Sequence, residues 1–247
     1  MIQTLGTVSR VSGVMLGMAL LLAGRPASAA YEVVAVTNGG TIDGVVTLTG
    51  KAPAGAVIKV TKNQDFCGAS IADPAYTVGA DGGLANVIVY LKDITKGKAA
   101  SAEPVQLGNE KCMFAPRAQG AMVGQQVKVF SDDPVLHNTH PQNAATNATI
   151  YNIALPFKGF SVTKPLPGSP GLIKIKCDAH EWMHSWIMEL EHPYFATTDA
   201  GGHFVIKDVP PGTYELATWH EVAGESTASV VVAAGATVKP KLSLAAK

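Results

Sequence analysis

Charged side chains are scarce in this sequence, and so are the motifs of the common catalytic classes. Only 15% of the 247 residues are charged, and the 19 basic residues balance the 19 acidic ones. Binding to nucleic acid calls for a basic patch, so we expect no nucleic-acid partner. The chain also contains no G-x-S-x-G, no H-E-x-x-H and no glycine-rich phosphate loop. We therefore expect that the protein is not an enzyme.

A long apolar run is missing as well. The apolar stretch 11–24 follows Arg10 and is shorter than the roughly 20 residues that a membrane-spanning helix needs. It precedes Ala27-Ser28-Ala29, which has the pattern of a signal-peptidase site. Residues 1–30 are therefore interpreted as a secretory signal that is cleaved near Ala29 or Ala30. This interpretation predicts a periplasmic or secreted protein that does not span the membrane.

The remaining composition favours strands over helices. The sequence has 25 glycines and 15 prolines, and its β-branched residues occur in short runs. Short strands separated by glycine- and proline-rich turns are typical of sandwiches and barrels. The mature chain is long enough for one large or two small β domains. The predicted fold class is all-β.

Three candidate metal ligands occur within seven residues. Cys177, His180 and Met183 form the pattern C-x2-H-x2-M directly after a strand-like segment, 172–176. A thiolate, an imidazole and a thioether suit copper better than magnesium, calcium or manganese, which prefer oxygen ligands. A blue-copper centre needs a second His in addition to these three ligands. That imidazole must come from elsewhere in the chain.

A candidate for the second His lies about forty positions upstream. The segment 126–130 alternates between apolar and polar residues like a half-buried strand, and the stretch 131–140 that follows it contains His137 and His140. A His just past such a strand, joined to a Cys-His-Met loop at the end of a later strand, resembles the cupredoxins. The ligand loop has the spacing of amicyanin-type members, and the pair His137-Asn138 matches their first His followed by Asn.

The cupredoxin resemblance implies a Greek-key β-sandwich with one type 1 copper ion. Its ligands would be His137, Cys177 and His180 in the equatorial plane and Met183 on the axis. Asn138 would tie the two ligand-bearing loops together, a supporting role that fixes ligand geometry. Trp182 would shield the metal from water. Proteins that this chain resembles carry plastocyanin-like or methylamine-utilisation labels.

The end of the chain has a different character. The pattern T-x-D-x-x-G-x-F begins at Thr198 and is followed by P-P-G-x-Y from Pro210. It resembles the carboxypeptidase regulatory-like module, which implies a smaller transthyretin-like β-sandwich. The expected domains are thus a copper domain, 31–191, and this module, 192–247. Strands from 40–62 could complete the short module, in which case the copper domain is inserted into it.

Two cysteines remain if Cys177 binds a metal. In an oxidising compartment Cys67 and Cys112 are then expected to form a disulfide. The alternatives are two separate buried thiols, or that one of the cysteines belongs to another metal site.

These patterns predict a one-electron carrier with copper as its cofactor. A dehydrogenase or a cytochrome would be its redox partner. Two alternatives stay open. One is a protein whose C-terminal module binds carbohydrate or another protein while the copper is structural, and the other is copper storage or delivery.

Overall fold

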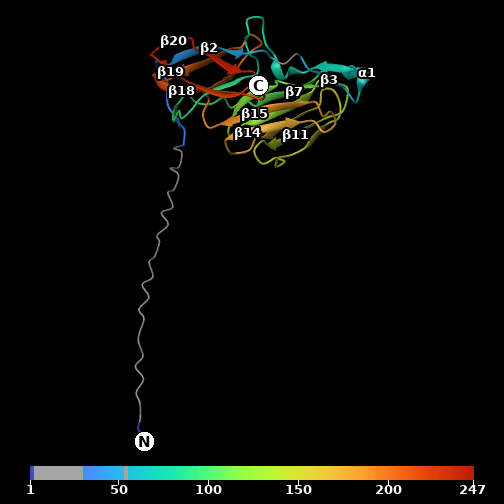
Figure 1. Ribbon diagram of the computed structural model, residues 1–247, viewed down its shortest axis with the longest axis horizontal. Helices are drawn as coiled ribbons and strands as arrows, with labels where there is room; N and C mark the ends of the chain where they lie inside the picture. The colour runs from blue at the N-terminus through green and yellow to red at the C-terminus, as the bar shows by residue number, and fades with distance from the viewer. Residues whose placement is uncertain (3–29, 53–54) are drawn as a thin grey trace.

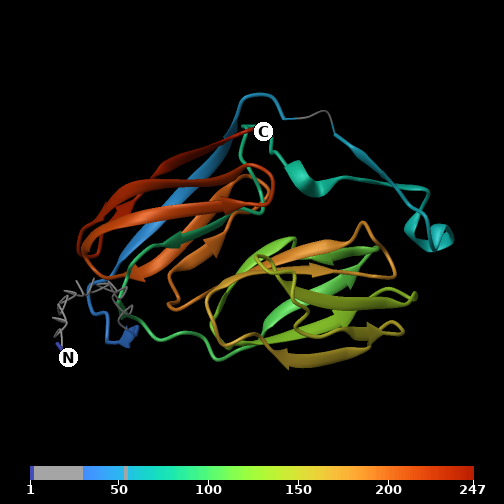
Figure 2. The ribbon, with the colours of Figure 1, turned by 60° about the horizontal axis from the view of Figure 1, so that its bottom comes forward.

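The computed structural model describes residues 1–2, 30–52 and 55–247. The predicted signal peptide, residues 1–30, lies almost wholly outside the described residues. Strands dominate the described part, and they form two β-sandwiches that lie side by side (Figures 1 and 2). The predicted all-β fold class is confirmed. Among the described residues, no helix is long and apolar enough to cross a membrane.

The first sandwich is built from the middle of the chain, coloured green to orange in Figure 2. One sheet has the order β13-β10-β7-β8 and the other the order β12-β11-β14-β15-β9. The strands of the first sheet are β7 (Val105–Glu110), β8 (Met113–Ala115), β10 (Gln126–Ser131) and β13 (Ser161–Pro165). Those of the second are β9 (Ala118–Met122), β11 (His137–Asn143), β12 (Ile153–Leu155), β14 (Gly171–Lys176) and β15 (His184–Leu190).

Alternation along these strands separates the core from the solvent. On β14, Ile173 and Ile175 are buried, whereas Lys174 and Lys176, which alternate with them, are not. Successive side chains of a strand point to opposite faces, so the next inward-facing position after Ile175 is Cys177. Cys177 is buried in the same core, at the end of the sandwich where β14 stops.

The second sandwich combines strands from both ends of the described chain. Its sheets have the orders β16-β5-β18-β19 and β17-β2-β20, with β21 also paired to β2. The strands that precede the first sandwich are β2 (Gly40–Thr49) and β5 (Ile88–Leu91). Those that follow it are β16 (Phe195–Thr197), β17 (His203–Val209), β18 (Gly212–His220), β19 (Gly224–Val232), β20 (Thr237–Val238) and β21 (Lys241–Ala245).

This pairing corrects the expected division at residue 191. Segment 31–191 is not one domain, because β2 pairs with β17 and β21, and β5 pairs with β16 and β18. In the C-terminal segment, β17, β20 and β21 pair with β2 rather than with one another, and β16 is joined to β18 through β5. This segment therefore takes β2 and β5 from the N-terminal side, and the first sandwich is inserted between β5 and β16.

Residues 57–76 belong to neither sandwich. Strands β3 (Val57–Lys59) and β4 (Ser70–Ala72) pair only with each other, and the short helix α1 (Gln64–Cys67) lies between them. We call residues 57–72 the arm. It lies along one end of the first sandwich, in cyan in Figure 2, and a 3-10 helix, Pro74–Tyr76, follows it. Another small pair joins β1 (Glu32–Val33) to β6 (Lys96–Gly97).

A buried ion pair joins the two sandwiches. Arg117 precedes β9 of the first sandwich, and Glu221 follows β18 of the second. The Arg117 Nε lies 2.6 Å from Glu221 Oε1, and both side chains are more than nine-tenths buried. Trp186 packs edge-on against Trp219 across the same boundary, with ring centroids 5.3 Å apart.

Candidate metal centre

Three of the predicted ligands meet in the first sandwich. The Cys177 Sγ and one ring nitrogen each of His137 and His180 all lie within 4.8 Å of one another, and all three residues are buried. His137 begins β11, and the other two belong to the loop between β14 and β15. The fourth, Met183, is fully buried in the same core at the far end of that loop.

Backbone hydrogen bonds close the ligand loop. The Cys177 N–H donates to the Met183 carbonyl at 3.1 Å, and the Met183 N–H donates to the His180 carbonyl at 2.9 Å. These bonds hold residues 177–183 as a tight turn between two paired strands. The spacing seen in the sequence therefore corresponds to a fixed arrangement of the three side chains.

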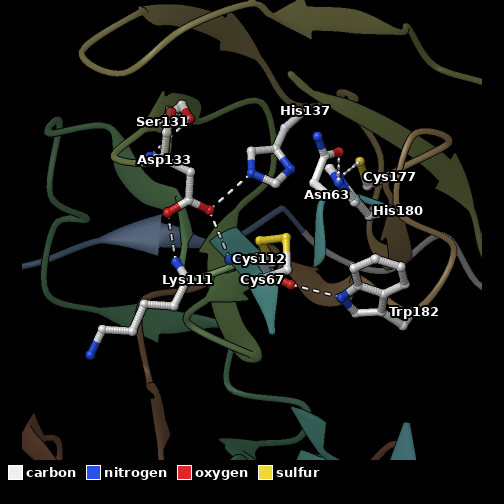
Figure 3. Close-up of a disulfide and its surroundings, with 10 residues drawn as sticks. All are labelled: Asn63, Cys67, Lys111, Cys112, Ser131, Asp133, His137, Cys177, His180 and Trp182. Carbon is white, nitrogen blue, oxygen red and sulfur yellow. Dashed lines mark hydrogen bonds and ion pairs between the residues drawn. A yellow bond between two sulfur atoms is a disulfide. The ribbon is translucent and has the colours of Figure 1, made fainter. Parts of the chain in front are cut away.

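The first imidazole is oriented by a buried carboxylate. His137 Nε2 donates to Asp133 Oδ2 at 2.9 Å, so its Nδ1 carries the free lone pair. That Nδ1 is buried without a hydrogen-bond partner among the described residues. Asp133 also accepts hydrogen bonds from the backbone N–H groups of Lys111 and Cys112 (Figure 3). A buried nitrogen with a lone pair and no hydrogen-bond partner is suited to bind a metal ion.

The second imidazole is oriented in the same way by an amide. His180 Nε2 donates to Asn63 Oδ1 at 2.9 Å, and its Nδ1 lies 3.8 Å from Cys177 Sγ. Burial, followed by the nearby His137, lowers the pKa of His180 to about 4. Burial also lowers the pKa of His137, although its hydrogen bond to Asp133 and the charge of that carboxylate oppose the shift. Both rings are therefore neutral at pH 7, as a metal ligand must be.

Asn138 links the two ligand-bearing segments. Its backbone N–H points at Cys177 Sγ at 3.4 Å, and its Oδ1 accepts from the backbone N–H groups of Asp178 at 2.7 Å and Ala179 at 3.0 Å. Burial raises the pKa of the Cys177 thiol, against the lowering effect of the backbone N–H groups of Asn138, His180 and Ala179. Those groups would stabilise a metal-bound thiolate without a second positive charge.

Trp182 and the disulfide form the next layer. The Trp182 ring lies edge-on to His180 with centroids 5.0 Å apart, and its Nε1 donates to the Cys112 carbonyl at 2.9 Å (Figure 3). Cys112 is disulfide-bonded to Cys67 of the arm, so the predicted bridge is confirmed, while Cys177 is the free cysteine. Cys112 also lies near Asp133 and His137, but its sulfur is taken by the bridge.

Two supporting residues were missed in the sequence. Asp133 could have been found, because an acidic residue four positions before a candidate ligand can reach it across a turn. Asn63 could not, because it lies 117 positions before His180 and no local pattern connects them. The link between the arm and this end of the sandwich is visible only through the pairing of Cys67 with Cys112.

This donor set fits copper. Two imidazole nitrogens that carry no proton, one thiol and a buried thioether are soft or borderline ligands, and no carboxylate is among them. A magnesium or calcium site would require several oxygens here.

Comparisons with known proteins found one family model and several solved structures that match part of the chain. Residues 171–240 match the model of polysaccharide lyase family 4, domain II, an fn3_3 β module. The matched range begins at β14 of the first sandwich and ends after β20 of the second. No curated protein matches this chain.

Several solved structures are similar to part of this chain. Amicyanin from Paracoccus versutus is 15% identical, with 37% of this chain and 85% of that chain covered and a TM-score of 0.32. A purple cupredoxin from Nitrosopumilus maritimus is 21% identical, with 35% and 99% covered and a TM-score of 0.30. A Cu-containing nitrite reductase from Thermus scotoductus is 19% identical, with 38% and 24% covered and a TM-score of 0.30.

Proposed function

We propose that the protein is a one-electron carrier that holds one type 1 copper ion through His137, Cys177, His180 and Met183. The observation that carries this proposal is the buried Cys177 thiol beside two imidazoles, with its Sγ and one ring nitrogen of each His within 4.8 Å of one another. The Nδ1 of His137 has no hydrogen-bond partner among the described residues, and the Nδ1 of His180 faces Cys177 Sγ at 3.8 Å. Bound copper would supply the one-electron chemistry by cycling between Cu(II) and Cu(I). Asp133 and Asn63 hold the imidazoles, and the buried surroundings exclude water.

The proposal extends to place and partners. An oxidising compartment agrees with the Cys67–Cys112 disulfide, so we propose a periplasmic or secreted protein. The partner would be a redox protein, such as a dehydrogenase or a cytochrome. One-electron transfer requires no residue that moves a proton to or from a substrate. We therefore propose a carrier rather than an enzyme.

Protein-film voltammetry on the copper-loaded protein tests this function. We expect a reversible one-electron couple, and its potential should rise in Met183→Leu, because a weak axial ligand tunes the potential of such a centre. Met188→Leu is the matched control, because Met188 is a buried methionine on β15 outside the site. An irreversible couple would contradict the electron-carrier role, and equal potentials in all three proteins would contradict Met183 as the axial ligand.

A second candidate function is supported by the match to a polysaccharide lyase module. In this alternative the second sandwich binds carbohydrate, and copper has a structural role. Retention on immobilised polysaccharides, compared before and after metal removal, distinguishes the two. Retention that survives metal removal, in a protein without a reversible couple, would favour carbohydrate binding. Copper storage or delivery would instead show rapid loss of copper to a chelator.

A further inference from the structure

Three kinds of contact join the arm to the first sandwich: apolar packing, a disulfide and a hydrogen bond. Val60 is fully buried in the core that contains Cys177, and Ile58 and Ile71 pack against the same core. Cys67 is covalently bonded to Cys112. Because β3 and β4 pair only with each other, these contacts and the Asn63 hydrogen bond are what join the arm to the metal centre.

Asn63 occupies an unusual position for its contact with His180. It is the N-cap residue of α1 and has a left-handed backbone, with φ 54° and ψ 38°. An Asn at an N-cap ordinarily accepts a hydrogen bond from the helix backbone. Here its side chain makes no such bond, and its oxygen accepts from His180 Nε2 instead (Figure 3).

Burial shows what this contact does. His180 has no exposed surface, whereas Asn63 itself is exposed. One side chain of the arm therefore separates the Nε2 edge of His180 from the solvent. On the other side of the site, His137 is held by Asp133 from the segment before β11, not by the arm.

We propose that the arm is a lid on the metal centre and that Asn63 is the positioning residue through which it acts. The lid fixes the Nε2–H tautomer of His180, so that Nδ1 faces Cys177 before any metal binds. It also keeps a redox partner from touching the His180 ring. This inference rests on the proposed copper site for its functional meaning, but the closure itself is a property of the metal-free protein.

The test is chemical modification of histidines in the metal-free full-length mature protein. Diethyl pyrocarbonate acylates accessible neutral imidazoles, and peptide mass spectrometry gives a separate rate for each His. In the wild type, we expect His180 to react as slowly as the buried His137 and much more slowly than His140, which keeps some exposed surface.

Two variants should open the lid to different degrees. Asn63→Ala removes one hydrogen bond and the covering side chain, so the His180 rate should rise about fivefold. The pair Cys67→Ser and Cys112→Ser lets the arm open as a unit, so the rate should rise roughly tenfold or more. Asp65→Ala is the matched control, because Asp65 is an exposed residue of the same helix, and it should leave the rate unchanged.

The His137 rate separates lid opening from general unfolding. It should stay at the wild-type value in Asn63→Ala, and circular dichroism should show the same strand content. The proposal is overturned if wild-type His180 reacts as fast as His140, or if Asn63→Ala leaves the His180 rate unchanged. Protected His180 in a protein that forms no blue copper centre would refute the proposed function and leave the lid intact.

Discussion

The Arg117–Glu221 pair offers a stability test that does not depend on any metal. Arg117 donates to both carboxylate oxygens of Glu221, at 2.6 and 2.9 Å, and Trp186 Nε1 donates to the same carboxylate at 3.1 Å. His184 lies against the pair, with its Nε2 3.0 Å from Glu221 Oε2. Glu221→Ala would leave the Arg117 guanidinium buried without its partner.

The expected cost follows from burial. Removing one partner of a buried ion pair destabilises a protein by about 3–5 kcal/mol. Replacing both, as Arg117→Met with Glu221→Met, should cost only about 1–3 kcal/mol, since the main remaining loss is the hydrogen bond of Trp186. The double-mutant cycle compares Arg117→Met, Glu221→Met and the two together, and each single Met variant leaves one buried charge unpaired. The coupling energy from this cycle is therefore expected to be about 3 kcal/mol or more.

Denaturant unfolding followed by tryptophan fluorescence measures this cycle. Lys92→Ala is the control, because Lys92 pairs with Glu215 at 2.9 Å on the surface, with both side chains more than 40% exposed. Such an exposed pair contributes little to stability, because water and salt screen it. Additive single and double variants, or a Glu221→Ala cost no larger than that of Lys92→Ala, would refute the reasoning.

The same pair predicts an acid transition. Burial raises the pKa of Glu221, but hydrogen bonds from His184 and Arg117 and the charge of Arg117 outweigh it and hold the pKa at about 2, against an ordinary value of 4.5. A depressed folded-state pKa gives stability that is present above pH 4.5 and is lost as pH falls toward 2. The loss across this window is about 3 kcal/mol. Glu221→Gln should show a flatter dependence there.

Two further predictions concern buried carboxyl groups. Burial raises the pKa of Glu189 from 4.5 to about 7, against the Gly124 N–H, so stability is lost as pH rises from 4.5 to 7. At pH 8, Glu189→Gln should therefore have a free energy of unfolding up to about 3 kcal/mol higher than that of the wild type, and it should melt at a higher temperature. This difference in stability should close near pH 4.5, and a difference that is constant with pH would contradict the reasoning. Asp133→Ala leaves three hydrogen-bond donors without an acceptor. It should lower the free energy of unfolding of the metal-free protein by about 3 kcal/mol in thermal melts, and Asp133→Asn should lower it less. A loss below about 1 kcal/mol would show that the carboxylate does not hold this end of the sandwich.

The sequence was most informative where the fold is local. The loop 177–183 could be interpreted directly, because its ligand spacing and the alternation of β14 together fix where the Cys177 side chain points. His137 also followed from a strand pattern. In each case the residues that matter lie within one or two adjacent elements.

Long-range pairing could be anticipated from the sequence only in outline. The range 40–62 was offered as a source of strands for the C-terminal module, and it contains β2, but β3 in the same range pairs only with β4, and β5 lies outside it. β2 and β5 complete a sandwich whose other strands lie more than a hundred residues away, and short apolar strands carry no label for their partner. Asn63 and Glu221 were missed for the same reason. Each acts on a residue of another element through a single side chain, and nothing in the neighbouring sequence marks it.

The most direct test of the copper site is a visible absorption and EPR spectrum of the mature protein with one equivalent of Cu(II), recorded beside Cys177→Ser. We expect an intense blue thiolate-to-copper band with narrow hyperfine splitting, absent in the variant, because Cys177 is the free thiol of the protein and lies between two imidazoles. A colourless protein, or an ordinary tetragonal Cu(II) spectrum that Cys177→Ser leaves unchanged, would contradict a type 1 centre at this position.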